Sequence, residues 1–159
     1  MRIIQVTIVL SLLSSCAFAN VKDRKSEYSV ADLKELVRPF YSDGCSRWPE
    51  GTNDNPEAWL ECCYEHDISY WMGGTEKERL SADLELRACV TEKFSEWMGF
   101  LMYYGVRTGG RPGFDTSYRW GYGWKINRGY FELTELEREY LQSILPLKGE
   151  DIHNYIKID

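Results

Sequence analysis

The chain lacks an excess of basic residues. Its 19 Lys and Arg residues stand against 25 Asp and Glu residues, and the formal net charge is −6 at pH 7. A negative chain is repelled by the phosphates of nucleic acids and by strongly anionic surfaces. The sequence also contains no internal repeat and no low-complexity tract. We therefore expect no nucleic acid partner and no repeat architecture.

A long apolar run occurs at the N-terminus, and no second run lies near it. Arg2, the apolar residues after it and the small-residue exit at Ala17-Phe18-Ala19 predict a cleaved secretory signal over residues 1–19. The run is at the short limit for a membrane span, so we expect cleavage and a secreted or periplasmic protein. Leu13-Ser14-Ser15-Cys16 also has the form of a bacterial lipoprotein box. A lipoprotein anchored through Cys16 is the alternative.

Removal of the signal leaves residues 20–159, which are 140 residues. This length suffices for one domain with a substantial core and is too short for two ordinary domains. We therefore expect a single domain over residues 20–159, and a monomer.

The mature chain keeps four cysteines, an even number in a chain bound for an oxidising compartment: Cys45, Cys62, Cys63 and Cys89. This pattern favours two disulfides over free thiols or a zinc site. Adjacent residues of a helix point about 100° apart, which disfavours a Cys62–Cys63 bond. Each of these two residues should therefore bond to Cys45 or Cys89, in either combination.

Apolar spacing and local start and stop signals predict several helices and one long loop. Residues 30–40 form a short helix ended by Pro39, and residues 41–55 form an irregular loop held by Cys45. A second helix starts at Pro56, with Asn55 as its cap, and runs to Met72 before Gly73-Gly74.

A third helix runs from Glu76 toward Phe94, with Thr75 and Glu78 as a capping box. The apolar stretch 95–106 predicts a continuation or a further helix, broken near Gly99 and ended at Gly105, and core packing is favoured over membrane binding for it. Residues 107–130 should be ordered but irregular, and residues 133–145 helical again.

The two central helices bring three polar side chains together. In an antiparallel hairpin, residues equally far from the turn are neighbours, and His66 and Asp83 are equidistant from the point between Gly74 and Thr75. Tyr70 lies one helical turn after His66, on the same face. A carboxylate that fixes the histidine tautomer leaves the other ring nitrogen to take a proton from water. The alternative is a buried histidine held by Asp83 for structural reasons only.

The segment from Asp43 to Val90 resembles the secreted phospholipase A2 family, as a divergent and bacterial member. The matching residues are Cys62-Cys63-x-x-His66-Asp67-x-x-Tyr70, Asp83 six residues before Cys89, and Cys45 upstream. The resemblance implies a mainly α fold, a disulfide-linked antiparallel helix hairpin of phospholipase A2 type with additional short helices and irregular loops. It also implies catalytic roles for His66, Asp83 and Tyr70, and Cys45–Cys63 and Cys62–Cys89 bonds.

The chain departs from the family at several positions. Ser69 and Ala82 replace two cysteines that are bonded to each other in the family, so one whole bridge is absent. Arg47 replaces the usual partner of Cys63, which is compatible with the resemblance if Cys45 becomes that partner.

The resemblance implies Ca²⁺ bound by the Asp67 carboxylate and by the carbonyl oxygens of Ser46, Trp48 and Glu50. Trp48 and Glu50 stand where the family has glycines, and only glycine adopts positive φ at little cost. The loop therefore departs from the calcium pattern. The side chains of Glu50, Asp43 or Asp54 are the alternative source of oxygens for a hard cation.

The function implied is a secreted hydrolase that cleaves the sn-2 carboxylic ester of phospholipids, with a phospholipid or a membrane surface as partner. The alternative is a catalytically inactive secreted binding module. It would use an aromatic and basic surface in residues 103–130, built from Tyr103, Tyr104, Tyr118, Trp120, Tyr122, Trp124 and Tyr130 with Arg107, Arg111 and Arg119. We favour core packing over a surface role for these rings.

Overall fold

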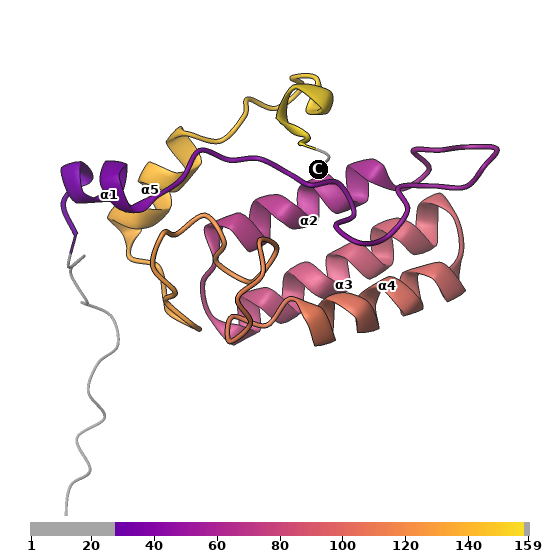
Figure 1. Cartoon of the computed structure of the whole chain (residues 1–159), viewed down its shortest axis with the longest axis horizontal. Helices are drawn as coiled ribbons and strands as arrows, with labels where there is room; N and C mark the ends of the chain where they lie inside the picture. Colours follow the sequence, from indigo (N-terminus) through magenta and orange to yellow (C-terminus); the bar gives the residue numbers. More distant parts are fainter. Residues whose placement is uncertain (1–27, 158–159) are drawn as a thin grey trace, which may run out of the picture.

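The computed structural model describes residues 28–157, which form five α-helices and a short 3₁₀ helix (Figure 1). No strand forms within residues 28–157, where only two isolated bridges pair extended segments. The expected signal segment and Cys16 lie outside the described residues. The helices are α1 (Val30–Leu36), α2 (Leu60–Met72), α3 (Glu76–Lys93), α4 (Glu96–Gly109), α5 (Glu135–Ser143) and η2 (Ile152–Tyr155).

Helices α2 and α3 form an antiparallel pair joined by a short turn (Figure 1). Gly73 ends α2 with φ 74°, a conformation that other residues adopt only with strain. Thr75 and Glu78 form the predicted capping box, in which Thr75 Oγ1 accepts from the Glu78 N–H and the Glu78 carboxylate accepts from the Thr75 N–H. The predicted end of α2 and the predicted start of α3 are therefore confirmed.

Helix α2 begins later than the sequence predicts. Residues 56–59 form turns instead of helix, and the Asn55 carbonyl accepts from the N–H groups of Thr52 and Ala58. The Trp59 N–H then donates to the Glu50 carbonyl at 3.0 Å. In a helix that began at Pro56, the Trp59 N–H would instead donate to the Asn55 carbonyl. This hydrogen bond within the loop therefore replaces a helical one, and α2 starts at Leu60.

Helix α1 is also shorter than predicted. It ends at Leu36, and Val37 is extended because it pairs with Trp124 in an isolated bridge. The Arg38 N–H donates to the Gly123 carbonyl at 2.8 Å. Helix α1 therefore ends through pairing with the segment at Gly123 and Trp124, and not through Pro39.

Helix α4 is a separate helix that passes through Gly99 without a break and ends at Gly109, so the predicted break and the predicted end at Gly105 are wrong. A Cβ atom at Gly99 would lie 2.4 Å from Thr91 Oγ1 and 2.6 Å from the Arg87 carbonyl oxygen. The glycine therefore allows α4 to lie close against α3. A packing requirement was mistaken for a helix stop.

Both disulfides have the partners that the resemblance implies. Cys45 bonds to Cys63 and ties the irregular loop to α2, whereas Cys62 bonds to Cys89 and clamps α2 to α3. Adjacent cysteines on α2 thus bond in different directions, as their helical spacing requires.

The segment that includes Trp120, Tyr122 and Trp124 lies in the core beside the α2–α3 turn. The Trp120 and Trp124 indoles donate to the carbonyl oxygens of Gly74 and Met72, each at 2.8 Å. These three rings are buried, so the core interpretation is confirmed for them. They do not belong to an aromatic surface.

No described helix is both long enough and apolar enough to cross a bilayer.

Helix α5 begins with the predicted capping box of Thr134 and Glu137. Near the chain end, the Ser42 N–H donates to the Tyr155 carbonyl at 2.9 Å, which holds η2 beside the loop before α2.

Candidate functional site

His66 on α2 contacts Asp83 on α3, as the hairpin geometry predicts. The His66 Nε2 atom lies 2.8 Å from Asp83 Oδ1. An ionised carboxylate can only accept a hydrogen bond, so Nε2 carries the proton in this pair and Nδ1 is free to accept one. The pair therefore sets the tautomer that a histidine general base needs.

Tyr70 completes the predicted group. Its hydroxyl donates to Asp83 Oδ1 at 2.8 Å, and its ring lies against His66 with centroids 4.2 Å apart. Burial and the neighbouring Asp83 charge raise the pKa of Tyr70 well above its ordinary value. Tyr70 therefore remains a neutral phenol that donates to the carboxylate.

Two arginines hold Asp83 from its other side, and the sequence analysis gave neither of them this role. Arg107 on α4 donates from Nη1 to Asp83 Oδ2 at 2.7 Å. Arg79 donates from Nε to the Tyr70 hydroxyl at 2.9 Å, and its Nε lies 3.9 Å from Asp83 Oδ2. Arg79 precedes Asp83 by four residues, a spacing that could have indicated the contact, whereas no local signal relates Arg107 to Asp83.

Asp83 is fully buried and charged. Burial alone would raise the pKa of Asp83, but the hydrogen bond and charge of His66, and the hydrogen bonds from Arg107 and Tyr70, lower it below the ordinary value. Hydrogen bonds to the charged form favour that form. Asp83 is therefore a fixed anion that orients the histidine.

His66 lies on the wall of a cavity of about 190 Å³. Apolar side chains from α3 and α4 make up much of the wall, including Leu86, Met102 and Val106. A Cβ atom at Gly110, on the same wall, would lie 2.4 Å from the Tyr70 ring, so this glycine brings the chain close to the site. An apolar hollow with few polar groups suits an acyl chain better than a sugar or a nucleotide.

Asp67 follows His66 and also lines the cavity, where it is buried. The Ser42 hydroxyl donates to Asp67 Oδ2 at 2.6 Å, a contact that the sequence analysis missed because Ser42 has no local signal. Burial raises the pKa of Asp67 well above its ordinary value, and the Ser42 hydrogen bond opposes this change only in part.

The loop residues expected to bind calcium are placed unequally. Ser46 and Trp48 line the cavity with Asp67, whereas Glu50 does not. The Glu50 carbonyl already accepts from the Trp59 N–H, and its carboxylate lies against Gly44. Calcium takes six to eight oxygen ligands, yet residues 28–157 contain no cluster of three acidic, His or Cys side chains able to hold a metal. Among the described residues, calcium at Asp67 would therefore take most of its ligands from backbone carbonyl oxygens.

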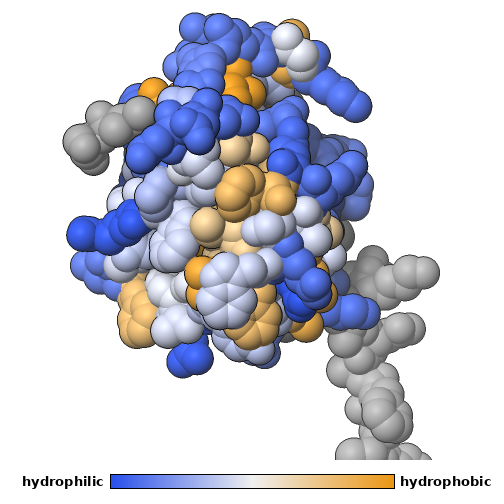
Figure 2. Space-filling view, turned by 90° about the vertical axis from the view of Figure 1, so that its right-hand side faces the viewer, coloured by the Kyte–Doolittle hydropathy of each residue, from blue (hydrophilic) through white to orange (hydrophobic). Residues whose placement is uncertain are grey.

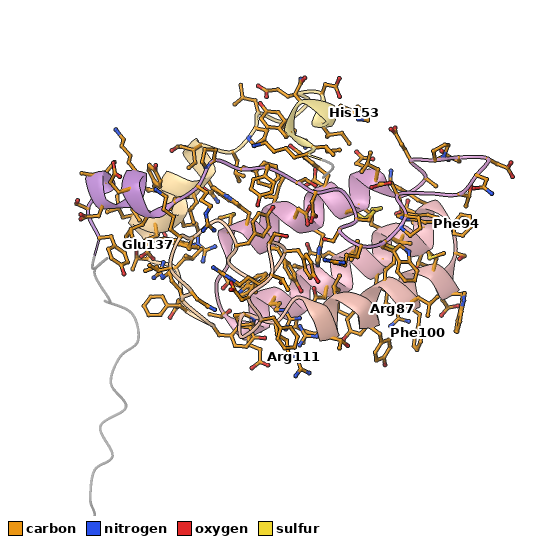
Figure 3. All side chains as sticks on the ribbon, in the orientation of Figure 1. Arg87, Phe94, Phe100, Arg111, Glu137 and His153 are labelled. Atoms are coloured by element: carbon orange, nitrogen blue, oxygen red, sulfur yellow. A yellow bond between two sulfur atoms is a disulfide. The ribbon has the colours of Figure 1, made fainter. Side chains whose placement is uncertain are left out.

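The outer face of α4 carries a row of exposed aromatic side chains, which the sequence analysis had placed in the core. Trp97 is 67% exposed and Tyr104 is 54% exposed. The Phe100 ring lies between them, with centroids 5.9 Å from Trp97 and 4.6 Å from Tyr104. Phe100 points away from the body of the molecule beside Arg87 (Figure 3). These three residues are called the α4 aromatic row below.

The space-filling view of the end of the molecule that carries the α3–α4 turn shows apolar side chains in its middle and lower parts, among hydrophilic ones (Figure 2). The opposite side of α4 contributes Met102 and Val106 to the cavity wall. One helix therefore connects an apolar surface with the cavity at His66.

Comparison of the chain with models of protein families, with curated proteins and with solved structures finds no match.

Proposed function

We propose that this protein is a secreted, phospholipase A2-like hydrolase that cleaves the sn-2 carboxylic ester of phospholipids. The observation that carries the proposal is the 2.8 Å contact between His66 Nε2 and Asp83 Oδ1 on the wall of an apolar cavity. A histidine with a fixed tautomer beside room for an acyl chain provides a general base and a substrate site together. The two disulfides are typical of proteins that fold in an oxidising compartment.

In the proposed reaction, a water molecule loses a proton to His66 Nδ1 as its oxygen attacks the ester carbonyl carbon. The tetrahedral intermediate then collapses, the bond from carbon to the sn-2 oxygen breaks, and His66 returns the proton to that oxygen. The products are a free fatty acid and a lysophospholipid. Asp83 keeps the proton on Nε2 throughout and stabilises the imidazolium between the two steps.

The steps above use only side chains of this chain, and none is routed through a cation. The resemblance nevertheless implies calcium at Asp67, where a bound cation would supply positive charge to the developing oxyanion. We propose Asp67 as the side chain that would hold it. Calorimetric titration with calcium, with Asp67→Asn as the control variant, tests this part by itself. Equal heats for the two proteins would remove calcium from the proposal.

The α4 aromatic row supports a membrane surface as the partner. Aromatic side chains are favourable at the boundary between water and lipid, and the negative charge of the chain favours zwitterionic over anionic lipid. A lipid that contacts this face lies next to the helix whose other side lines the cavity.

The test is fatty acid release from phosphatidylcholine liposomes by the purified protein, compared with His66→Gln. We expect release by the wild-type protein and none by the variant, because glutamine cannot act as the base. The assay should be run both with calcium and with a chelator. Absence of release by the folded wild-type protein under both conditions would refute hydrolysis.

The binding-module alternative receives less support from the structure. Of its seven rings, Trp120, Tyr122 and Trp124 are buried. Of its arginines, Arg107 bonds to Asp83 and Arg119 is buried. These side chains cannot form one continuous outer surface.

A further inference from the structure

A second cavity, of about 390 Å³, lies apart from the His66 cavity and shares no lining residue with it. Three of its lining side chains are cationic and one is acidic: Arg38, Arg119 and Lys125, with Asp115. This excess of positive charge contrasts with the net charge of −6 of the whole chain. The cavity is therefore a local positive region on an acidic protein.

The two arginine head groups lie close together. Arg38 Nη1 and Arg119 Nη2 both donate to the Trp124 carbonyl oxygen, at 3.4 Å and 3.2 Å. Arg119 Nη1 donates to the carbonyls of Trp120 and Gly121, and Arg38 Nη1 donates to that of Tyr122. Backbone carbonyls therefore hold both like charges close together in the wall of the cavity.

These carbonyls orient Arg119 but do not neutralise it. Arg119 is only 7% exposed, and no carboxylate of the described residues lies within 4.0 Å of the guanidinium nitrogens of Arg38 or Arg119. Burial, followed by the charge of Arg38, lowers the pKa of Arg119, and Asp115 opposes this change. A buried charge is unfavourable without a partner of opposite charge.

A separate observation points to the same cavity. The hydroxyl oxygen of Thr116, a lining residue, is buried without a hydrogen-bond partner among the described residues. Buried hydroxyl groups are nearly always hydrogen-bonded. Ser117 and Asn127 add further polar side chains to the wall. The cavity thus offers both cations and hydrogen-bond donors to an incoming group.

We propose that this cavity binds the phosphate group of a phosphomonoester. Guanidinium groups match the geometry of phosphate oxygens and bind them through paired hydrogen bonds. A dianionic phosphate with several acceptor oxygens uses the two arginines, Lys125 and the Thr116 hydroxyl together. The cavity volume of about 390 Å³ is many times the roughly 30 Å³ that one water molecule takes in the liquid. The cavity therefore has room for a phosphate group and for the rest of the ligand. The source is a soluble phosphate ester or a lipid headgroup.

The test is calorimetric titration of the purified protein with glycerol 3-phosphate, and separately with inorganic phosphate and with glycerol. We expect one saturable site for glycerol 3-phosphate and no heat for glycerol. Arg38→Gln and Lys125→Gln, at exposed positions, should each weaken binding about tenfold, because each removes a charge-assisted hydrogen bond. Arg119→Ala should abolish binding if the variant folds. The proposal does not depend on Arg119→Ala, because the exposed variants test the same cavity.

Arg111→Gln is the matched control, because Arg111 is exposed and points away from the body (Figure 3), and it lines neither cavity. It makes the same charge change and should leave the affinity unaltered.

A second experiment uses phosphatidylcholine vesicles with and without phosphatidic acid. Stronger binding to phosphatidic acid that Arg38→Gln removes and Arg111→Gln retains identifies a lipid headgroup as a source. No binding of any phosphate compound, or equal weakening by Arg38→Gln and Arg111→Gln, overturns the proposal. Hydrolysis by His66 is not needed for any of these results.

Discussion

Arg107 on α4 donates to Asp83 Oδ2 at 2.7 Å, while His66 and Tyr70 contact Oδ1 of the same carboxylate. The carboxylate is thereby held from two sides by three side chains, which come from the two helices α2 and α4. Because Arg107 contacts His66 only through Asp83, it would act as a positioning residue in the proposed hydrolysis. Its contribution can be separated from that of the base.

Arg107→Gln should lower kcat for phosphatidylcholine hydrolysis about tenfold, a part of what a general base contributes. KM should stay nearly unchanged, because the cavity wall at Met102 and Val106 is intact. Arg107→Lys should restore part of kcat, since it keeps the charge and one donor. Steady-state kinetics on all three proteins measures this, with Arg111→Gln as control. A change in KM alone would contradict the positioning role.

Asp83 should make stability depend on acid pH. Its pKa is lower in the folded protein than the ordinary aspartate value, so it stabilises the fold above its unfolded pKa of about 3.9. This contribution is lost as the pH falls from about 4 toward the folded pKa. Urea unfolding at pH 7 and at steps below pH 5 should therefore show a steeper loss for wild type than for Asp83→Asn.

The same substitution leaves Arg79 and Arg107 without their anion, so Asp83→Asn should also be less stable at pH 7. Circular dichroism at pH 7 checks that the variant is folded before the slopes are compared. Equal slopes below pH 5 would show that Asp83 does not titrate differently in the folded and unfolded states.

Removal of either disulfide should lower the free energy of unfolding by about 3 kcal/mol, since each closes a loop of moderate length. The effects on function should differ. The double variant Cys45→Ala with Cys63→Ala releases the loop that lines the His66 cavity. The double variant Cys62→Ala with Cys89→Ala leaves that loop attached.

We therefore expect the first double variant to raise KM at a temperature where both are folded. Liposome kinetics together with urea unfolding measures the two effects separately. A larger rise in KM for the second double variant would contradict this assignment.

Trp97→Ala should weaken partitioning onto phosphatidylcholine vesicles about tenfold, as expected when burial of one large aromatic side chain is lost. Hydrolysis of a short-chain, monomeric phosphatidylcholine should be unaffected, because Trp97 does not line the cavity. Leu147→Ala is the control, since Leu147 is 74% exposed but lies outside α4. Vesicle sedimentation measures both proteins. Equal losses for the two variants would mean that the α4 aromatic row is not the contact surface.

Much of the helical framework was predictable because its signals are local. The capping boxes at Thr75 and Thr134 and the stop at Gly73 lie within four residues of the backbone groups that they satisfy. The meeting of His66 with Asp83 followed from the same information, since a short turn between two helices sets which residues are neighbours.

Features that depend on distant segments were not predictable in this way. The early end of α1 depends on pairing of Val37 with Trp124, and the role of Gly99 depends on Thr91 across the α3–α4 contact. Proline and glycine often end helices, so local reasoning placed the end of α1 at Pro39 and a break of α4 near Gly99.

The sequence by itself determined that the chain is helical, where α3 and α5 begin and that a histidine faces an acid, because periodicity, capping and turn residues act over one or two turns of chain. Only the tertiary structure decided that Arg107 holds Asp83, that Ser42 holds Asp67, and that Arg38 and Arg119 share one carbonyl. Each of these contacts joins residues at least 24 positions apart or depends on a third, distant segment. Such contacts arise from how buried surfaces fit together, and no short stretch of sequence contains that information.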